Sequence, residues 1–287
     1  MSFIPHTPEC FASHMGVWAM ESVSCQTRLA AIRSGLLQAR EENAGTSLSE
    51  KIQDVNGVRV IPVSGVMMRG QSKFDEGTST VDLRREVARA NRDPEVNGIA
   101  LMIDSPGGHV AGMEELAADL SASNTPIRSY IQNTGASAAY WAAASTESIT
   151  IAPMAEAGSL GVYAVLQDVS KALEADGVEM TVVSTGEQKG LGADGKVTPE
   201  LVASVQKRVD FVNKFFAKSV RDGRGFDKET SKALHTGEMF NAPEALANGL
   251  VDAVDSAEGF LKSFSQEVAP KTSRSAKARV AIARQRR

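Results

Sequence analysis

The sequence predicts an α/β fold in which strands and helices alternate along most of the chain. Short apolar runs of strand length are followed by stretches where apolar residues recur every three or four positions, the spacing of one helix face. The run GIALMI (98–103) is apolar throughout, which is typical of a strand covered on both faces of its sheet. The chain has 287 residues, 42% of them hydrophobic and 23% charged, so we expect one sizeable globular domain with tails.

In the first half of the chain, a separate N-terminal segment precedes this alternation. Residues 16–40 have helical spacing, and the polar stretch 41–50 is expected to be a linker. The elements that follow are a strand over 57–63, a helix from its cap Thr80 to about Asn91, the strand 98–103, a helix with Met113, Leu116, Ala117 and Leu120 on one face, a strand over 127–131, and a helix opened by Ser137 that runs through Ala144.

The second half continues the pattern and contains the longest helix. Its first elements are extended pieces at 148–151 and 158–165, a helix over 168–175, a strand over 179–183, and a loop over 184–197 with four glycines. Thr198 caps the long helix, Pro199 takes its first position, and Gly223 is placed to end it. Its apolar stripe consists of Leu201, Val205, Val209, Val212, Phe216 and Val220.

The charge is divided between an acidic body and a basic end. A net charge of −4 does not favour nucleic-acid binding by the whole chain, but residues 268–287 hold seven Lys or Arg and no acidic residue. We expect a disordered tail over 263–287, because its few large apolar groups cannot offset the entropy lost on ordering. Such a tail should attract an acidic partner, nucleic acid being the less favoured one.

Other features predict a protein that stays in the compartment where it is made, outside the membrane. Cys10 and Cys25 are expected to be free thiols in a reducing cytoplasm. The N-terminus lacks the basic start and continuous apolar run of a signal peptide. The longest fully apolar run, 138–144, is far shorter than the ~20 residues that span a membrane.

The segment Asp104–Gly108 (DSPGG) has the character of an oxyanion-binding turn. It follows a buried strand and precedes a helix, and its glycines allow a substrate to approach the main chain. Backbone N–H groups at such a turn can stabilise negative charge that develops in a transition state. A plain strand-to-helix turn would have the same sequence, so this motif alone does not decide the function.

Ser137 is a candidate nucleophile, because GASAAY (135–140) surrounds its hydroxyl with small residues at a helix start. An ordinary capping serine remains the alternative. No histidine lies between Ser137 and the end of the long helix, and lysine is the known substitute base in Ser–Lys hydrolases. Lys189, in the glycine-rich loop, is one candidate base. Lys196, next to Asp194, and His109, next to Gly108, remain alternatives.

From about Gly57 to Asp252 the chain resembles the signal peptide peptidase A family of serine peptidases. The resemblance implies a spiral fold of the ClpP/crotonase type, built from repeated β-β-α units, with the peptidase domain over 51–262 and a helical segment and linker over 1–50. The matching stretches occur in the family's order and spacing: GIALMIDSPGG (98–108), GASAAYWAAAS (135–145), AGSLGV (157–162), STGEQKG (184–190), RDGRGF (221–226) and ALANGLVD (245–252).

The resemblance also implies roles for individual residues, with no metal and no cofactor. Ser137 would be the nucleophile and Lys189 its general base. The amides of Gly108 and Ala138 would form the oxyanion hole, supported by Gly107. Ser159 matches a family position that can hydrogen-bond the lysine.

The chain departs from the family's pattern in two places. Ala138 and Ala139 stand where glycines are usual, which would narrow the cleft. A glycine usual near 242–245 is missing from FNAPEAL.

The chain carries a single copy of these motifs, and it also contains GVWAME (16–21) and GVRVIPVSG (57–65). These features make it most similar to phage head maturation proteases related to lambda protein C. This resemblance predicts a closed homo-oligomer in the host cytoplasm, inside the prohead, with scaffold, capsid or portal proteins as substrates or partners.

Three alternative functions remain. One is a bacterial peptidase that degrades signal peptides or other peptides. Another is a crotonase-type acyl-CoA enzyme, which needs neither Ser137 nor Lys189. The third is a catalytically silent assembly protein.

Overall fold

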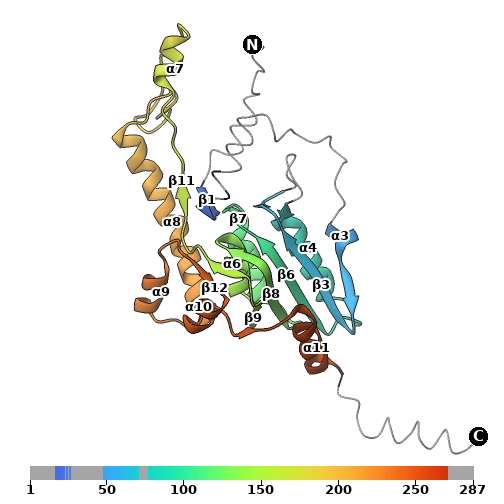
Figure 1. Ribbon diagram of the computed structural model, residues 1–287. Coiled ribbons are helices and arrows are strands. Elements are labelled where there is room, and N and C mark those ends of the chain that lie inside the picture. The colour runs from blue at the N-terminus through green and yellow to red at the C-terminus, as the bar shows by residue number, and fades with distance from the viewer. Residues whose placement is uncertain (1–16, 23, 25, 27–47, 71–76, 271–287) are drawn as a thin grey trace, which may run out of the picture.

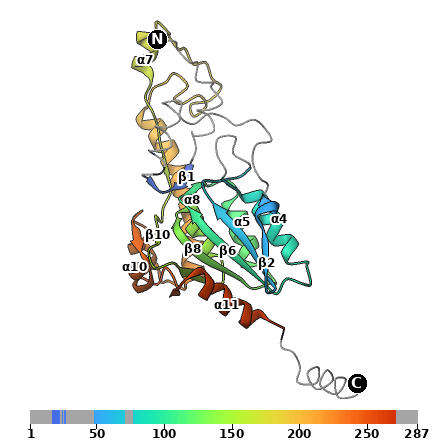
Figure 2. The same cartoon turned by 45° about the vertical axis from the view of Figure 1, so that its right-hand side comes forward.

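The computed structural model describes residues 17–22, 24, 26, 48–70 and 77–270, and its strands form two sheets. The larger sheet follows the path β12-β10-β8-β6-β3-β2, with β9 beside β8 and β13 beside β9. The smaller sheet has the order β11-β1-β7-β4-β5. Figures 1 and 2 show the sheets and most helices gathered in one body, while residues 165–197, which include α7, project away from it and are called the extension below.

The strands and helices have the following bounds. The strands are β1 (Val17–Met20), β2 (Gln53–Val55), β3 (Val58–Ser64), β4 (Met67–Met68), β5 (Thr78–Ser79), β6 (Gly98–Ser105), β7 (Gly107–His109), β8 (Ile127–Ala136), β9 (Ser148–Ile151), β10 (Glu156–Gly158), β11 (Tyr163–Ala164), β12 (Met239–Asn241) and β13 (Ala253–Val254). The helices are α3 (Leu48–Lys51), α4 (Thr80–Ala90), α5 (Met113–Ser121), α6 (Ala138–Ala144), α7 (Ser170–Ala175), α8 (Pro199–Arg224), α9 (Lys228–Leu234), α10 (Ala242–Ala247) and α11 (Ala257–Val268).

The body is a spiral of β-β-α units, as the family resemblance implies. Strands β3, β6, β8 and β10 are parallel neighbours in the larger sheet. After β3 the chain enters the smaller sheet as β4 and β5 and then forms α4, and after β6 it enters as β7 and then forms α5. The third unit differs, because β8 passes directly into α6. The position beside β7 in the smaller sheet is taken instead by β1, from the N-terminal part of the chain.

The predicted burial of β6 on both faces is confirmed. Ile99, Leu101 and Ile103 belong to the main core, together with α4, α5 and α6. Ala100 and Met102 face the other way, into a smaller cluster that includes Phe260 and Phe264 of α11. Because successive side chains of a strand point to opposite faces of the sheet, one continuous apolar run supplies residues to both clusters. α11 packs on the sheet through Val268, so the folded part extends past the predicted domain boundary at 262.

Two helix ends differ from the prediction for local reasons. α4 is capped by Ser79, whose hydroxyl accepts a hydrogen bond from the Asp82 N–H, so Thr80 is already its first residue. α8 begins as predicted, with Thr198 as cap, but continues past Gly223 to end at Gly225 with φ 65°. A Cβ at Gly223 would lie 1.7 Å from the Ala144 carbonyl oxygen. Gly223 is therefore a packing residue, which lets α8 approach α6 closely.

Two other predicted elements differ from the structure. Val17–Met20 is a strand rather than the start of a helix, whereas residues 22, 24 and 26 are helical as predicted, and residues 27–40 of the predicted helix lie outside the described residues. Residues 179–183 form no strand. They belong to the extension that carries α7, where their side chains are exposed and no neighbouring strand pairs with them.

The apolar stripe of α8 is buried only in part. Phe216 and Val220 are fully buried, whereas the stripe residues before them are partly exposed where α8 leaves the body. Cys10, Cys25 and the basic stretch 271–287 lie outside the described residues. In the part of the chain that is described, no helix combines the length and apolarity needed to cross a membrane.

Candidate active site

Ser137 occupies a sharp, strained turn between β8 and α6. Its backbone has φ 55° and ψ −114°, which a residue with a side chain rarely adopts, and its N–H donates to the Gly158 carbonyl at 2.8 Å. A strained strand-to-helix turn of this kind is how α/β hydrolases present a nucleophilic serine. The side chain is fully buried, and its hydroxyl lies 3.5 Å from the Gly161 carbonyl oxygen.

The predicted oxyanion turn lies next to Ser137. Gly107 has φ 92°, and a Cβ there would lie 2.9 Å from the Ala138 nitrogen. A Cβ at Gly108 would lie 1.9 Å from the Met67 carbonyl oxygen, so only glycine fits between β4 and β7. Ser105 supports this turn, since its hydroxyl donates to the Gly65 carbonyl and accepts from the Gly107 N–H.

Ala138 is the first residue of α6, so its N–H has no partner inside the helix. This amide and the turn of β7 therefore lie close together beside Ser137, as predicted for an oxyanion hole. Ala138 and Ala139 are both fully buried in the main core. Their methyl groups are packed in the protein interior, and the expected narrowing of the cleft by these residues stays a prediction.

A third segment that meets Ser137 contains Ser159. The Gly158 carbonyl accepts a hydrogen bond from the Ser137 N–H, and the Gly161 carbonyl lies opposite the Ser137 hydroxyl. Ser159, between them, is buried with φ 52°, and its N–H donates to the Glu238 carbonyl at 2.7 Å. The structure thus brings Ser159 into the neighbourhood of Ser137, while its expected hydrogen bond to Lys189 stays a prediction.

Lys189 is not part of this neighbourhood within a single chain. It is exposed in the loop between α7 and α8, where its N–H donates to the Gly186 carbonyl. This loop is held to the extension, because the Gly195 carbonyl and the Val197 N–H bond to the segment that leads into α7. α8 starts beside this loop, and its residue Phe216, which stacks on Trp141 of α6, lies about 26 Å further along the helix axis at the usual helical rise.

The two alternative bases lie in different surroundings. Lys196 is exposed and paired with Asp194 at 3.6 Å. His109 directly follows the oxyanion turn, and its Nδ1 accepts a hydrogen bond from the Ala111 N–H. Burial, and to a lesser extent the charge of Arg208, lowers the pKa of His109. His109 is therefore neutral near pH 7 and lies at the edge of the site.

The lowered pKa values of His109 and His235 predict a loss of stability on mild acidification. Burial lowers the pKa of both from an ordinary value of 6.5. The unfolded chain therefore takes up more protons than the folded chain once the pH falls below about 6.5, and folding weakens from there through the lower, folded pKa values. Urea unfolding between pH 7.5 and 5 should show a falling midpoint, and His109→Gln with His235→Gln should flatten this fall. An equally steep fall in the double variant would contradict the assignment.

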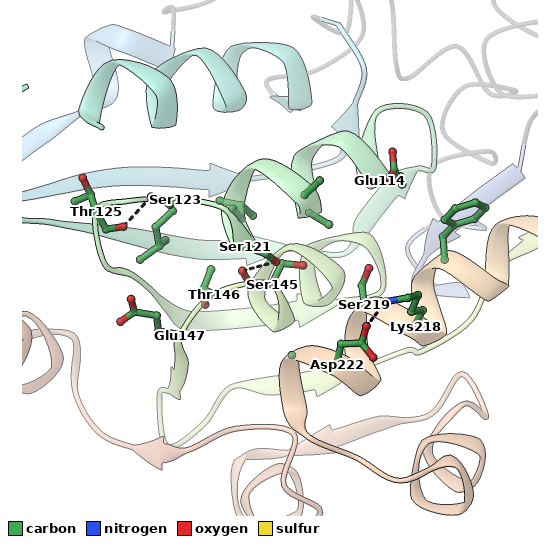
Figure 3. Close-up of a pocket in the computed structure, with 16 residues that line it drawn as sticks. Glu114, Ser121, Ser123, Thr125, Ser145, Thr146, Glu147, Lys218, Ser219 and Asp222 are labelled. Carbon is green, nitrogen blue, oxygen red and sulfur yellow. Dashed lines mark hydrogen bonds and ion pairs between the residues drawn. The ribbon is translucent and has the colours of Figure 1, made fainter. Parts of the chain in front are cut away.

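A separate pocket of about 650 Å³ lies between α5, the turn that follows α6, and α8 (Figure 3). Its rim carries polar groups, including the Lys218–Asp222 ion pair of α8 and the bond from the Ser121 hydroxyl to the Ser145 carbonyl. None of the predicted site residues lines it. This pocket therefore does not bear on the assignment of Ser137.

Two of the sequence motifs have a structural rather than a catalytic arrangement. Arg224, in RDGRGF, donates two hydrogen bonds to the carboxylate of Asp252, in ALANGLVD, and a third to the Gly249 carbonyl. Burial alone would raise the pKa of Asp252, but the bonds from Arg224 and from the Ile149 N–H outweigh it and lower the pKa. These motifs fasten the end of α8 to the edge of the larger sheet.

A serine on a strained turn at a helix start, beside backbone N–H groups, is the arrangement in which serine hydrolases present their nucleophile. The model of peptidase family S49 matches residues 119–271, which is more than half of the chain. The chain belongs to peptidase family S49.

Several known proteins are similar to this chain. "Protease 4" of Salmonella typhi is 29% identical over 202 residues, covering 69% of this chain and 32% of that protein. "Capsid assembly protease C" of Escherichia phage lambda is 27% identical over 252 residues, covering 84% and 56%. "Head-tail preconnector protein GP5" of Enterobacteria phage P21 is 29% identical over 210 residues, covering 70% and 42%. The chain thus spans from about a third to somewhat over half of the length of these relatives.

Among solved structures, a ClpP1 mutant from Listeria monocytogenes aligns with 12% sequence identity and a TM-score of 0.47, covering 70% of this chain and 93% of that one.

Proposed function

We propose that this chain is a serine endopeptidase in which Ser137 is the nucleophile and Lys189 the general base. The observation that carries the proposal is the strained, buried turn of Ser137 beside Gly108 and Ala138, in a chain of peptidase family S49. The hydroxyl would attack a peptide carbonyl, whose oxygen would be stabilised by the two backbone N–H groups. Ser159 would hold the lysine amine. A crotonase-type reaction would not require this serine.

The separation of Ser137 and Lys189 within one chain supports a site completed by a second copy. The extension exposes large apolar side chains that a soluble monomer would leave in water: Val165, Val169, Val178, Met180, Val182 and Val183. Contact with a neighbouring copy would bury them and could bring Lys189 of one chain to Ser137 of the next. Repeated around an axis, this head-to-tail contact closes into a ring.

Substitution of the exposed apolar residues of the extension should weaken the oligomer. Met180→Asp with Val183→Asp places two charges in the expected contact, and light scattering should show smaller particles than for the unaltered chain. Met154→Asp is the control, because Met154 is 95% exposed but lies between β9 and β10, away from the extension. An unchanged particle mass for the double variant, or an unaltered chain that is monomeric and fully active, would contradict the proposal.

Capsid maturation is the biological role that we propose, because two of the similar proteins are named for phage head assembly. Scaffold, capsid or portal proteins would be the substrates, inside proheads in the host cytoplasm. The peptidase domain would run from residue 51 to the end of α11, and the basic tail would bind an acidic partner. Co-expression with capsid and scaffold proteins, followed by gel electrophoresis, tests this role. Uncleaved capsid and scaffold proteins, with other peptides cleaved, would favour a bacterial peptidase like the similar "Protease 4".

A further inference from the structure

β1 lies between the oxyanion strand β7 and the strand β11, and it is antiparallel to both. Trp18 is opposite His109 on one side and Tyr163 on the other. The place it fills is the one that the third β-β-α unit leaves vacant, because the chain turns at Ser137 into α6 without adding a strand. The smaller sheet therefore has one strand position beside β7 that a segment from outside the repeated units fills.

The register places a peptide carbonyl of β1 at the candidate oxyanion hole. The Val110 N–H donates to the Val17 carbonyl at 3.3 Å, and the Glu21 N–H donates to the Pro106 carbonyl at 2.8 Å. Hydrogen-bonded pairs alternate along antiparallel strands, so the paired residues between these two bonds are Ala19 and Gly108. The Gly108 N–H thus faces the Ala19 carbonyl.

A second observation places this carbonyl near the turn that holds both proposed donors. A Cβ built on Gly107 would lie 2.3 Å from the Ala19 carbonyl oxygen and 2.9 Å from the Ala138 nitrogen. The Ala19 oxygen and the Ala138 nitrogen therefore both lie beside Gly107, and the Ala19 oxygen is also opposite Gly108. The carbonyl oxygen of a scissile peptide would have to lie in this region.

The side chains of β1 show which peptides this strand position fits. Trp18 and Met20 are buried in a cluster with Val66, and the Trp18 ring meets His109 edge-on at 5.4 Å. Ala19 is fully buried between them and belongs to the main core on the other face. This strand position thus fits a peptide that has a small residue opposite Gly108 and a large apolar residue on each side of that small residue.

We propose that Val17–Met20 is an internal strand that blocks the position between β7 and β11, where an extended substrate peptide has to bind. The proposal rests on the proposed function, because it takes Gly108 and Ser137 as parts of a peptidase site. Ser137 is fully buried, so part of the chain has to move before a substrate can reach the hydroxyl. β1 keeps the enzyme inactive, and a substrate peptide binds by displacing it.

The test measures peptide binding in chains that carry Ser137→Ala, so the result does not depend on which residue is the nucleophile. The probe is a fluorescent decapeptide with the sequence of residues 15–24, MGVWAMESVS. Trp18→Ala with Met20→Ala weakens the internal strand, and the affinity for the probe should rise about tenfold or more, because the open site becomes more populated. Met102→Ala with Phe260→Ala is the matched control. It removes a methionine and an aromatic ring from the cluster on the far face of the larger sheet, and it should leave the affinity unchanged.

Equal affinity of the Trp18/Met20 variant and its Ser137→Ala parent would overturn the proposal. If that variant does not fold, hydrogen exchange on the parent decides. Saturating decapeptide should remove the protection of the amides of 17–20, and protection that persists with the peptide bound would also overturn the proposal. Failure of the proposed function would be seen in a separate experiment: if Ser137 is not the nucleophile, the Ser137→Ala chain will cleave peptides at an unchanged rate.

Discussion

Ser137→Ala is expected to reduce kcat/KM for peptide cleavage by about 10⁴-fold or more, because no other group can form the acyl-enzyme. The folded chain should be almost as stable as before. The hydroxyl makes only a 3.5 Å contact with the Gly161 carbonyl, and alanine retains the Cβ that already fits the strained turn.

The control for this variant is Ser145→Ala, at the other end of α6. Its hydroxyl donates to the Trp141 carbonyl, so its removal perturbs the same helix without touching the site. We expect Ser145→Ala to cleave peptides nearly as well as the unaltered chain. Cleavage by the Ser137→Ala variant at a rate close to that of the unaltered chain would rule out Ser137 as the nucleophile.

Lys189→Ala is expected to be almost as damaging as Ser137→Ala, since a nucleophile and its base act as a unit. Lys189→Arg should fail as well, because a guanidinium stays charged and cannot accept the serine proton. Lys196→Ala is the matched control, as it lies in the same loop and is paired only with the nearby Asp194. Normal cleavage by the Lys189→Arg variant would exclude Lys189 and leave Lys196 and His109 as the candidates.

Mixing the two inactive chains tests whether the lysine comes from a neighbour. In oligomers assembled from equal amounts of the Ser137→Ala and Lys189→Ala chains, about a quarter of the sites would combine Ser137 from one chain with Lys189 from the next. Co-expression of the two variants should therefore restore about a quarter of the unaltered activity. An inactive mixture that forms full-size oligomers would show that the base is supplied within one chain.

Local sequence signals predicted the parts of the fold that local chemistry decides. The apolar run of β6 required cover on both faces, and the structure provides it with the main core and α11. Thr198 and Pro199 fixed the start of α8, because a side-chain cap and a preset φ act within one turn. The small residues around Ser137 correctly placed it at the start of a helix, although the strained backbone of that turn had no signal of its own.

Features that depend on distant parts of the chain were not predictable in this way. Val17 and Met20 are spaced as on a helix face, yet β1 is a strand because β7 and β11 offer hydrogen-bonding partners on both sides. Residues 179–183 have strand-like composition but no partner strand beside them. The position of Lys189 relative to Ser137 within one chain depends on the direction of the extension, which spacing along the chain does not encode.

Covalent labelling by a fluorophosphonate tests whether Ser137 is an activated nucleophile. The probe should be applied to the oligomeric full chain and to the Trp18/Met20 variant, and the modified residue located by mass spectrometry of digested peptides. We expect one label per chain, on Ser137. The label should form faster in the Trp18/Met20 variant and should be lost in both Ser137→Ala and Lys189→Ala. Label on a different serine, or peptide cleavage by a chain whose Ser137 stays unmodified at saturating probe, would contradict the assignment of Ser137.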